Sequence, residues 1–197
     1  TGTITSEEYF EHLFGNNPTG SFSDYYSEVS YEKFYATGHV YGWYDTGISK
    51  SEAVDDARSF ISSILELSDA DIDFSMYDND GPDNIPNSGD DDGYVDGLIV
   101  IFPGNGADSN IDPDNMWPHA WGVHHNNTTS DDSYNGGVIK VHHYTLCPEK
   151  YNNDIRPIGV YVHEFGHILG LPDLYDTTDK DSITHDFHDG VFICSII

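Results

Sequence analysis

The sequence has few cysteines, few basic residues and no long apolar run, and each shortage excludes a class of protein. Cys147 and Cys194 suffice for one disulfide in a secreted protein, but they lack the close Cys or His spacing of a structural zinc site. No hydrophobic run is long enough to span a bilayer. Seven Lys and Arg residues against 35 Asp and Glu give a net charge of −28, which repels nucleic acid and anionic membranes. We therefore expect no nucleic-acid and no membrane partner.

The length of the chain indicates a single domain. A chain of 197 residues can bury a hydrophobic core without disulfide or metal staples. It starts at Thr1 with no initiator methionine and no signal peptide, so we expect a mature region or a fragment of a longer protein. The sequence leaves the oligomeric state open.

The most informative stretch runs from residue 163 to residue 173. His163 and His167 are four residues apart, so on a helix both imidazoles lie on one face and can bind one metal ion. Glu164 is then held beside the metal, where it can accept a proton from water bound there. The alternative is a surface helix with two unrelated histidines, because the HExxH spacing also arises by chance.

The residues after the second histidine favour the metal site. Gly170 can end the helix in a left-handed conformation, and Pro172 prevents the helix from continuing. The chain must turn, which allows Asp173 to return as a third ligand. Two imidazoles and one carboxylate leave a fourth position open, as in a catalytic zinc site rather than a structural one.

A second site is predicted in the acidic region at residues 69–96. Its carboxylates would repel one another unless a cation were bound, and calcium prefers six to eight oxygen ligands of this kind. The spacing resembles a DxDxDG calcium loop with an insertion after Gly81. The predicted ligands are Asp78, Asp80, Asp92 and Asp96, with Asp83 and Asp90 as possible substitutes. The alternative is a solvated acidic loop that binds no ion.

Hydrophobic patterning predicts both strands and helices. Capping boxes at Thr5–Glu8 and Ser49–Glu52 indicate two helix starts, and Pro157 is placed to begin the helix that carries the histidines. An edge strand is expected around Pro118, in residues 116–123. We expect a strand at 34–44, a central strand buried on both faces at 98–102, a polar loop at 124–137 and a strand at 138–146.

A family resemblance adds to these patterns. The segment HEFGHILGLPDLYD resembles the zinc motif of the immune inhibitor A family of secreted metallopeptidases, and further similar segments occur in the same order. These segments are Phe22–Tyr31, Gly42–Tyr44, Tyr77–Gly81, Asp92–Asp96 and Trp117–Trp121. The resemblance implies a zincin-like α/β (α+β) fold, with a twisted mixed sheet, packed helices and a zinc-binding helix. It also implies that extended substrate pairs with the edge strand near residues 117–121, the alternative being a buried aromatic patch there with no substrate contact.

The resemblance covers residues 1–176, which we interpret as a zincin-like catalytic domain that includes the acidic calcium region. Residues 177–197 do not match and form a truncated or replaced C-terminal tail. Related zinc proteases often place a methionine turn after the motif, whereas Met76 and Met116 both precede it.

We therefore predict a secreted zinc endopeptidase that cleaves protein or peptide substrates, with Zn²⁺ as cofactor and Ca²⁺ as a second bound ion. His163, His167 and Asp173 would hold zinc, and Glu164 would act as general base. One alternative is a catalytically incomplete zinc and calcium module retained for binding or structure. Another is an acidic calcium-binding module in which the zinc motif is incidental.

Overall fold

The computed structural model describes residues 2–109 and 115–173. The predicted tail at 177–197 and the possible Cys147–Cys194 pairing both involve residues outside these ranges, although Cys147 itself is described and fully buried. Within the described ranges, no helix has the length and apolar character needed to cross a membrane.

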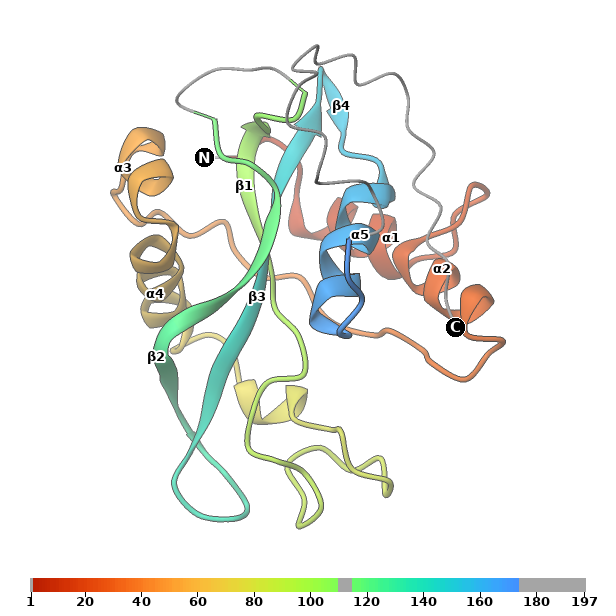
Figure 1. Cartoon of the computed structure of the whole chain (residues 1–197), viewed down its shortest axis with the longest axis vertical. Coiled ribbons are helices and arrows are strands. Elements are labelled where there is room, and N and C mark those ends of the chain that lie inside the picture. The colour runs from red at the N-terminus through yellow and green to blue at the C-terminus, as the bar shows by residue number, and fades with distance from the viewer. Residues whose placement is uncertain (1, 110–114, 174–197) are drawn as a thin grey trace.

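The described strands form one mixed sheet in the order β1–β3–β2 (Figure 1). β1 (Ile99–Asn105) pairs in parallel with β3 (Val138–Tyr151), β2 (His119–Asp132) pairs with β3 in antiparallel, and the short β4 (Asp154–Ile155) also pairs with β3. The predicted mixed sheet is confirmed. The prediction that 98–102 is the central strand is wrong, because β3 occupies the centre and β1 lies at the end of this order.

Helices cover both faces of the sheet (Figure 1). On one face lie α1 (Ser6–Phe14), α2 (Phe22–Val29) and α5 (Ile158–Ile168), which share an aromatic core with Cys147. On the other face lie α3 (Lys50–Asp55), α4 (Ala57–Ser68) and the 3-10 turn η1 (Phe74–Tyr77). Val100 and Phe102 of β1 belong to the second core, while Ile99 and Ile101 pack against the first, so β1 is apolar on both faces as expected.

Both predicted capping boxes are present. Thr5 and Glu8 exchange hydrogen bonds at the start of α1, as do Ser49 and Glu52 at the start of α3. The expected single helix after Ser49 is instead divided in two. Asp56 has φ −144° and ψ 78°, which stops α3, and its Oδ1 then accepts the Ser59 N–H at 3.1 Å to cap α4.

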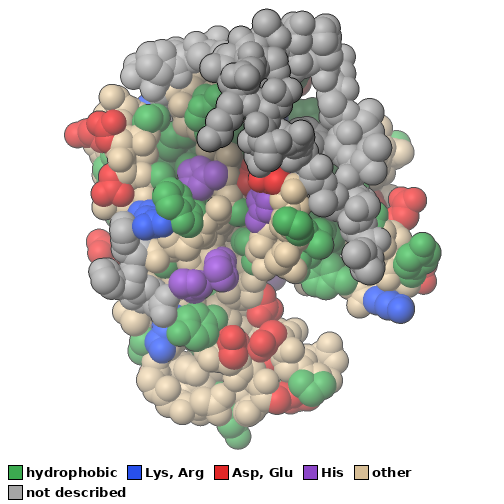
Figure 2. Space-filling view, in the orientation of Figure 1, with side chains coloured by type: hydrophobic (Ala, Val, Ile, Leu, Met, Phe, Trp, Pro, Cys, Tyr) green, Lys and Arg blue, Asp and Glu red, His purple; other side chains and the backbone are tan. Residues whose placement is uncertain are grey.

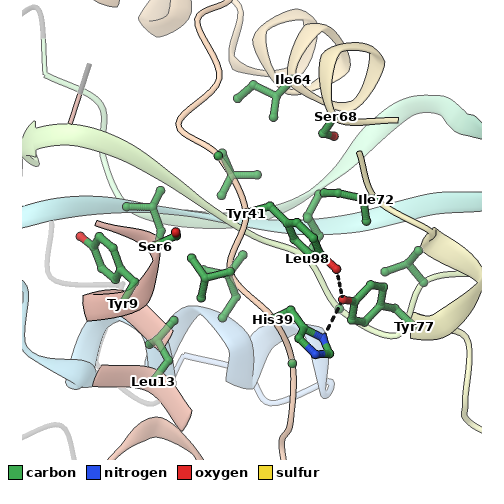
Figure 3. A pocket seen from close by; sticks show the side chains of 18 of the residues that line it. Ser6, Tyr9, Leu13, His39, Tyr41, Ile64, Ser68, Ile72, Tyr77 and Leu98 are labelled. Carbon is green, nitrogen blue, oxygen red and sulfur yellow. Dashed lines mark hydrogen bonds between the residues drawn. The ribbon is translucent and has the colours of Figure 1, made fainter. Parts of the chain in front are cut away.

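Residues 34–44 do not form the predicted strand. The segment has no strand pairing, and Gly42 has φ +88°, a conformation that takes the chain out of the β region. A cavity of about 1060 Å³ lies between this segment and the sheet, and Figure 3 shows His39, Tyr41 and Tyr77 together at its polar end. There the Tyr77 hydroxyl is 2.9 Å from His39 Nδ1 and 2.8 Å from the Tyr41 hydroxyl.

The predicted polar loop at 124–137 is also wrong over most of its length. β2 continues to Asp132 and pairs with β3 at Thr128–Lys140 and Asp132–Val138. Residues 124–132 of β2 are all polar, so they lack the alternation of apolar and polar residues by which a half-buried strand is predicted. Only the turn after Asp132 remains outside a strand.

Candidate functional site

Helix α5 carries the predicted metal motif and is anchored by aromatic residues. The Tyr26 hydroxyl donates to the Val162 carbonyl at 2.7 Å, and the buried Tyr161 donates to the Pro148 carbonyl at 2.9 Å. The Phe22 and Phe165 rings pack edge to face with their centroids 5.2 Å apart. These contacts fix the helix between α2 and β3, which holds its polar face in a defined position.

The chain reverses direction immediately after α5. Gly170 has φ +85°, as expected for a residue that ends a helix. The N–H of Gly170 donates to the His167 carbonyl at 3.0 Å, and the N–H of Leu171 donates to the Gly166 carbonyl at 2.9 Å. Because these two bonds fold the chain back along the helix, Asp173 arrives beside the two histidines.

The structure brings His163, His167 and Asp173 together. Asp173 Oδ1 lies 3.3 Å from His163 Nε2 and 3.4 Å from His167 Nε2. Ligand atoms about 2.0–2.1 Å from zinc in a tetrahedron lie about 3.3–3.4 Å from one another. The two distances from Asp173 therefore match the ligand spacing of tetrahedral zinc, and all three candidate ligand atoms lie within 4.8 Å of one another.

The histidines are also in a suitable state for metal binding. His167 Nδ1 lies 2.8 Å from the Leu171 carbonyl, which requires the proton on Nδ1 and leaves the lone pair of Nε2 directed toward Asp173. Burial, together with the neighbouring His167 ring, lowers the pKa of His163 despite the opposing effect of Asp173. The lowered pKa favours a neutral His163, the form that binds metal, and the Leu171 contact sets which ring nitrogen of His167 faces the site.

Glu164 is buried next to the ligands, with 7% of its surface exposed. Burial is the main cause that raises its pKa to about 7, and the negative charges of Asp173 and Asp108 add to this. His167 and a hydrogen bond from the Ala120 N–H act in the opposite direction. A carboxyl group with this pKa can accept and return a proton near neutral pH. The Ala120 hydrogen bond was not predictable from sequence, because it depends on where β2 passes α5.

The predicted edge strand is confirmed, because β2 ends the strand order and, among the described residues, no strand pairs with its outer side. Trp117 and Trp121 near its start are exposed by about half. Between them, His119 places Nδ1 2.9 Å from the Trp117 carbonyl and Nε2 3.1 Å from the Tyr144 hydroxyl. Figure 2 shows histidine and hydrophobic side chains gathered on this face of the molecule, over the β2–β3 hairpin and α5.

In the acidic region the structure brings together Asp78, Asp80 and Asp91, whose carboxylates approach within 4.8 Å of one another. Asp78 is almost fully buried, and burial together with the charges of Asp91 and other neighbours raises its pKa to about 6. Asp91 accepts the Gly81 N–H at 2.7 Å. Sequence reasoning did not select Asp91, because the run of three aspartates at 90–92 gives no indication of which one turns inward.

The other predicted calcium residues lie outside that group of three. Asp92 Oδ1 accepts the Tyr94 N–H at 2.9 Å, and Asp83 Oδ1 accepts the Ile85 N–H at 2.8 Å. Asp90 is hydrogen bonded to the Ser88 hydroxyl. Asp96 lies within 3.4 Å of the Asn79 N–H, and its pKa is raised to about 6 by desolvation and by the charges of Asp80 and Asp78.

The large cavity is separate from the proposed metal ligands and from Glu164. None of His163, Glu164, His167 and Asp173 lines it, although Phe165 and Asp96 do. Its position between α1, α4 and β1 makes it part of the packing of the scaffold (Figure 3). The polar groups that can perform chemistry are on the opposite side of α5, next to β2.

Fold and site together define a zincin-like peptidase domain, and comparisons with known proteins agree. The chain belongs to the family described as immune inhibitor A peptidase M6, whose catalytic-domain profile matches residues 3–187. Immune inhibitor A of Bacillus thuringiensis subsp. alesti is 30% identical over 211 residues, which cover 88% of this chain and 29% of that protein. The pre-pro-metalloprotease PrtV of Vibrio cholerae serotype O1 (strain M66-2) is 26% identical over 179 residues, which cover 80% of this chain and 19% of that protein.

The family match and these relatives support a metalloprotease function and a metal cofactor for the chain. The chain spans less than a third of the length of either relative. The family profile, over residues 3–187, includes the histidines, Glu164 and Asp173.

Proposed function

We propose that the chain is a zinc-dependent endopeptidase that acts outside the cell on proteins or peptides. The observation that carries this proposal is the convergence of His163 and His167 on one oxygen of Asp173, at 3.3 and 3.4 Å, beside a buried glutamate. Family membership supports the same reaction class.

In this proposal His163, His167 and Asp173 hold the ion. Zinc, when bound, lowers the pKa of water and polarises a carbonyl group. Glu164 accepts a proton from the attacking water and returns it to the leaving amine, a role suited to its raised pKa.

The outer side of β2 is the proposed substrate-binding edge. Among the described residues no strand pairs with this side, so an extended peptide can pair with its main chain. Ala120 on this strand lies close enough to Glu164 to influence the pKa of that carboxyl group. A peptide that pairs there passes next to the general base. The substrate is therefore expected to bind as an unfolded or extended segment.

We further propose that the acidic region binds calcium through Asp78, Asp80 and Asp91, with Asp92 and Asp96 available to complete the ligand set. Burial, together with the charges of Asp91 and other neighbours, raises the pKa of Asp78, and a divalent cation would offset that accumulated negative charge. Calcium at extracellular concentrations suits a site of this kind, which supports a secreted location.

Replacement of Asp173 tests the metal centre. Because changes in outer-shell partners already cost about 10–100-fold in metal affinity, loss of a direct ligand in Asp173→Ala should cost at least about 100-fold. Zinc content after dialysis, measured by mass spectrometry, should fall from about one ion per chain to nearly none. The exposed Asp154→Ala is the matched control and should retain zinc.

Equal zinc retention by the two variants would exclude Asp173 as a ligand. If the parent chain holds zinc but does not hydrolyse peptides, the alternative of a non-hydrolysing metal-binding module would replace the proposed function.

A further inference from the structure

A second pocket lies at the start of β2, between that strand and the junction of α3 and α4. Its volume is about 370 Å³, enough for one large side chain. Trp117 and Trp121 line it, exposed by 51% and 56%, and the buried Ala53 and Met116 line its inner part. The pocket is thus an apolar recess with two half-exposed indole rings.

Strand register places this pocket on the sheet face opposite to helix α5. His119 pairs with Leu146 and Trp121 pairs with Tyr144, and both partners belong to the core shared with α4. Directly paired residues point to the same face, so His119 and Trp121 point toward α3 and α4. Trp117, just before the strand, lines the same pocket. Ala120, which pairs with Thr145, has its side chain on the other face, and its backbone is close enough to Glu164 to influence the pKa of that carboxyl group.

This arrangement determines how a bound peptide is presented. In a peptide strand paired with the outer side of β2, successive side chains point alternately to the two faces of the sheet. Side chains on one face approach α5 and Glu164, whereas those on the other approach the pocket. A substrate side chain that faces Glu164 is therefore followed by one on the opposite face, and this neighbouring side chain contacts Trp117 and Trp121.

We propose that this pocket is a side-chain subsite that selects substrates with a bulky aromatic residue at one position. The inference rests on the proposed function, because it assumes that substrate pairs with β2. It assigns Trp117 and Trp121 as specificity-determining residues of the reaction.

The charges around the pocket define the class of side chain that fits. The Arg58 guanidinium lies 3.8 Å from the centre of the Trp121 ring, where its charge disfavours a basic substrate side chain. Asp55 and Asp56 also line the pocket and are exposed, and they disfavour an acidic one. A large uncharged ring that packs against the indoles satisfies both restrictions.

The test compares two blocked decapeptides of Gly, Ser and Ala that differ only by one central Phe or Ala. Binding to Glu164→Gln in the presence of zinc is measured by fluorescence anisotropy, so that hydrolysis does not interfere. Filling an apolar pocket changes recognition by about 10–200-fold, and we expect the Phe peptide to bind at least about tenfold more tightly.

Two variants alter the pocket without touching the metal ligands. Val54 lines the pocket and is 40% exposed, so Val54→Phe should fill the recess from its surface. Trp117→Ala should remove one wall. Both should abolish the preference for Phe, and Val54→Phe should leave binding of the Ala peptide within about twofold. Leu67→Phe is the matched control, because Leu67 is 45% exposed on α4 and lines neither cavity.

Equal binding of the two peptides by Glu164→Gln would overturn the subsite, as would a preference that survives in both pocket variants. Loss of the preference in Leu67→Phe as well would also overturn it. The proposed function is tested separately, by hydrolysis. If it is wrong, the parent chain will hydrolyse neither peptide, and the binding comparison with Glu164→Gln will still decide whether the subsite exists.

Discussion

Glu149 is buried on β3 and joins the start of the chain to the sheet. Its carboxylate accepts the Ile4 N–H and the Gly104 N–H, each at 2.8 Å, and also contacts Thr3. Burial on its own would raise the pKa of Glu149, but these donors hold it below its usual value. The ionised form is therefore the one that stabilises the fold.

Glu149→Gln should destabilise the protein by about 1.5–3 kcal/mol at pH 7, the range for hydrogen bonds to a charged group. Because the folded pKa is depressed, this contribution is complete above the unfolded pKa of about 4.3 and is lost as pH falls below it. Urea denaturation at pH 7 and pH 3.5 should show a difference that shrinks at the lower pH. The exposed Glu66→Gln should show little change, and a constant difference for Glu149→Gln would contradict this account.

At the residue scale, the candidate metal centre was predictable because its parts are close in sequence. His163, Glu164 and His167 fall within one and a half helical turns, and the turn at Gly170 brings Asp173 back. Asp91 was not predictable, because its inward orientation depends on N–H donors from Gly81 and Ser88.

The loop between η1 and β1 carries seven of the 35 Asp and Glu residues of the chain. In the absence of an ion, the pKa values of Asp78 and Asp96 are raised to about 6 from an ordinary value near 3.8. A raised folded pKa means that the metal-free fold loses stability as pH rises from about 4 through 6. A bound cation would reverse this loss.

Calcium at about 100 times its Kd should stabilise the protein by about 2.7 kcal/mol, which corresponds to roughly 5–10 °C in Tm for a chain of this size. The gain should be larger at pH 7 than at pH 5, because the carboxylates must be ionised to bind. Asp91→Asn should lose more of the gain than the adjacent Asp92→Asn, as measured by calorimetry with and without calcium. No calcium-dependent shift at pH 7 would indicate a solvated acidic loop.

Elements with local signals were predicted best. The capping boxes at Thr5 and Ser49 rely on contacts three residues apart, and both are present. The strand prediction failed for residues 34–44. Their aromatic content indicates a strand, but Gly42 has a positive φ and the segment pairs with no described strand. It also failed for the far end of β2, whose strand conformation comes from pairing with β3 rather than from its own polar residues.

On the scale of the whole molecule, the sequence indicated a mixed sheet with helices on it, but it could not give the strand order. The apolar run at Ile99–Phe102 resembles a central strand because helices cover both its faces, yet β3 takes the centre. Strand order depends on pairings between residues more than forty positions apart, such as Ile101 with Cys147, and these leave no local pattern.

The four residues proposed to perform the chemistry occupy one side of helix α5 and the turn after it, in a chain with a net charge of −28. The central claim is that this assembly hydrolyses peptide bonds with Glu164 as the base.

The most direct measurement is hydrolysis of unfolded casein by the parent chain and by Glu164→Ala, with calcium present and zinc content measured on both. We expect about one zinc per chain in each protein, and a rate for Glu164→Ala that is lower by roughly 10²–10⁴-fold. Equal rates in the two proteins, or zinc in both with hydrolysis in neither, would contradict the assignment of Glu164 and of the activity. Absence of zinc from both would contradict the metal centre itself.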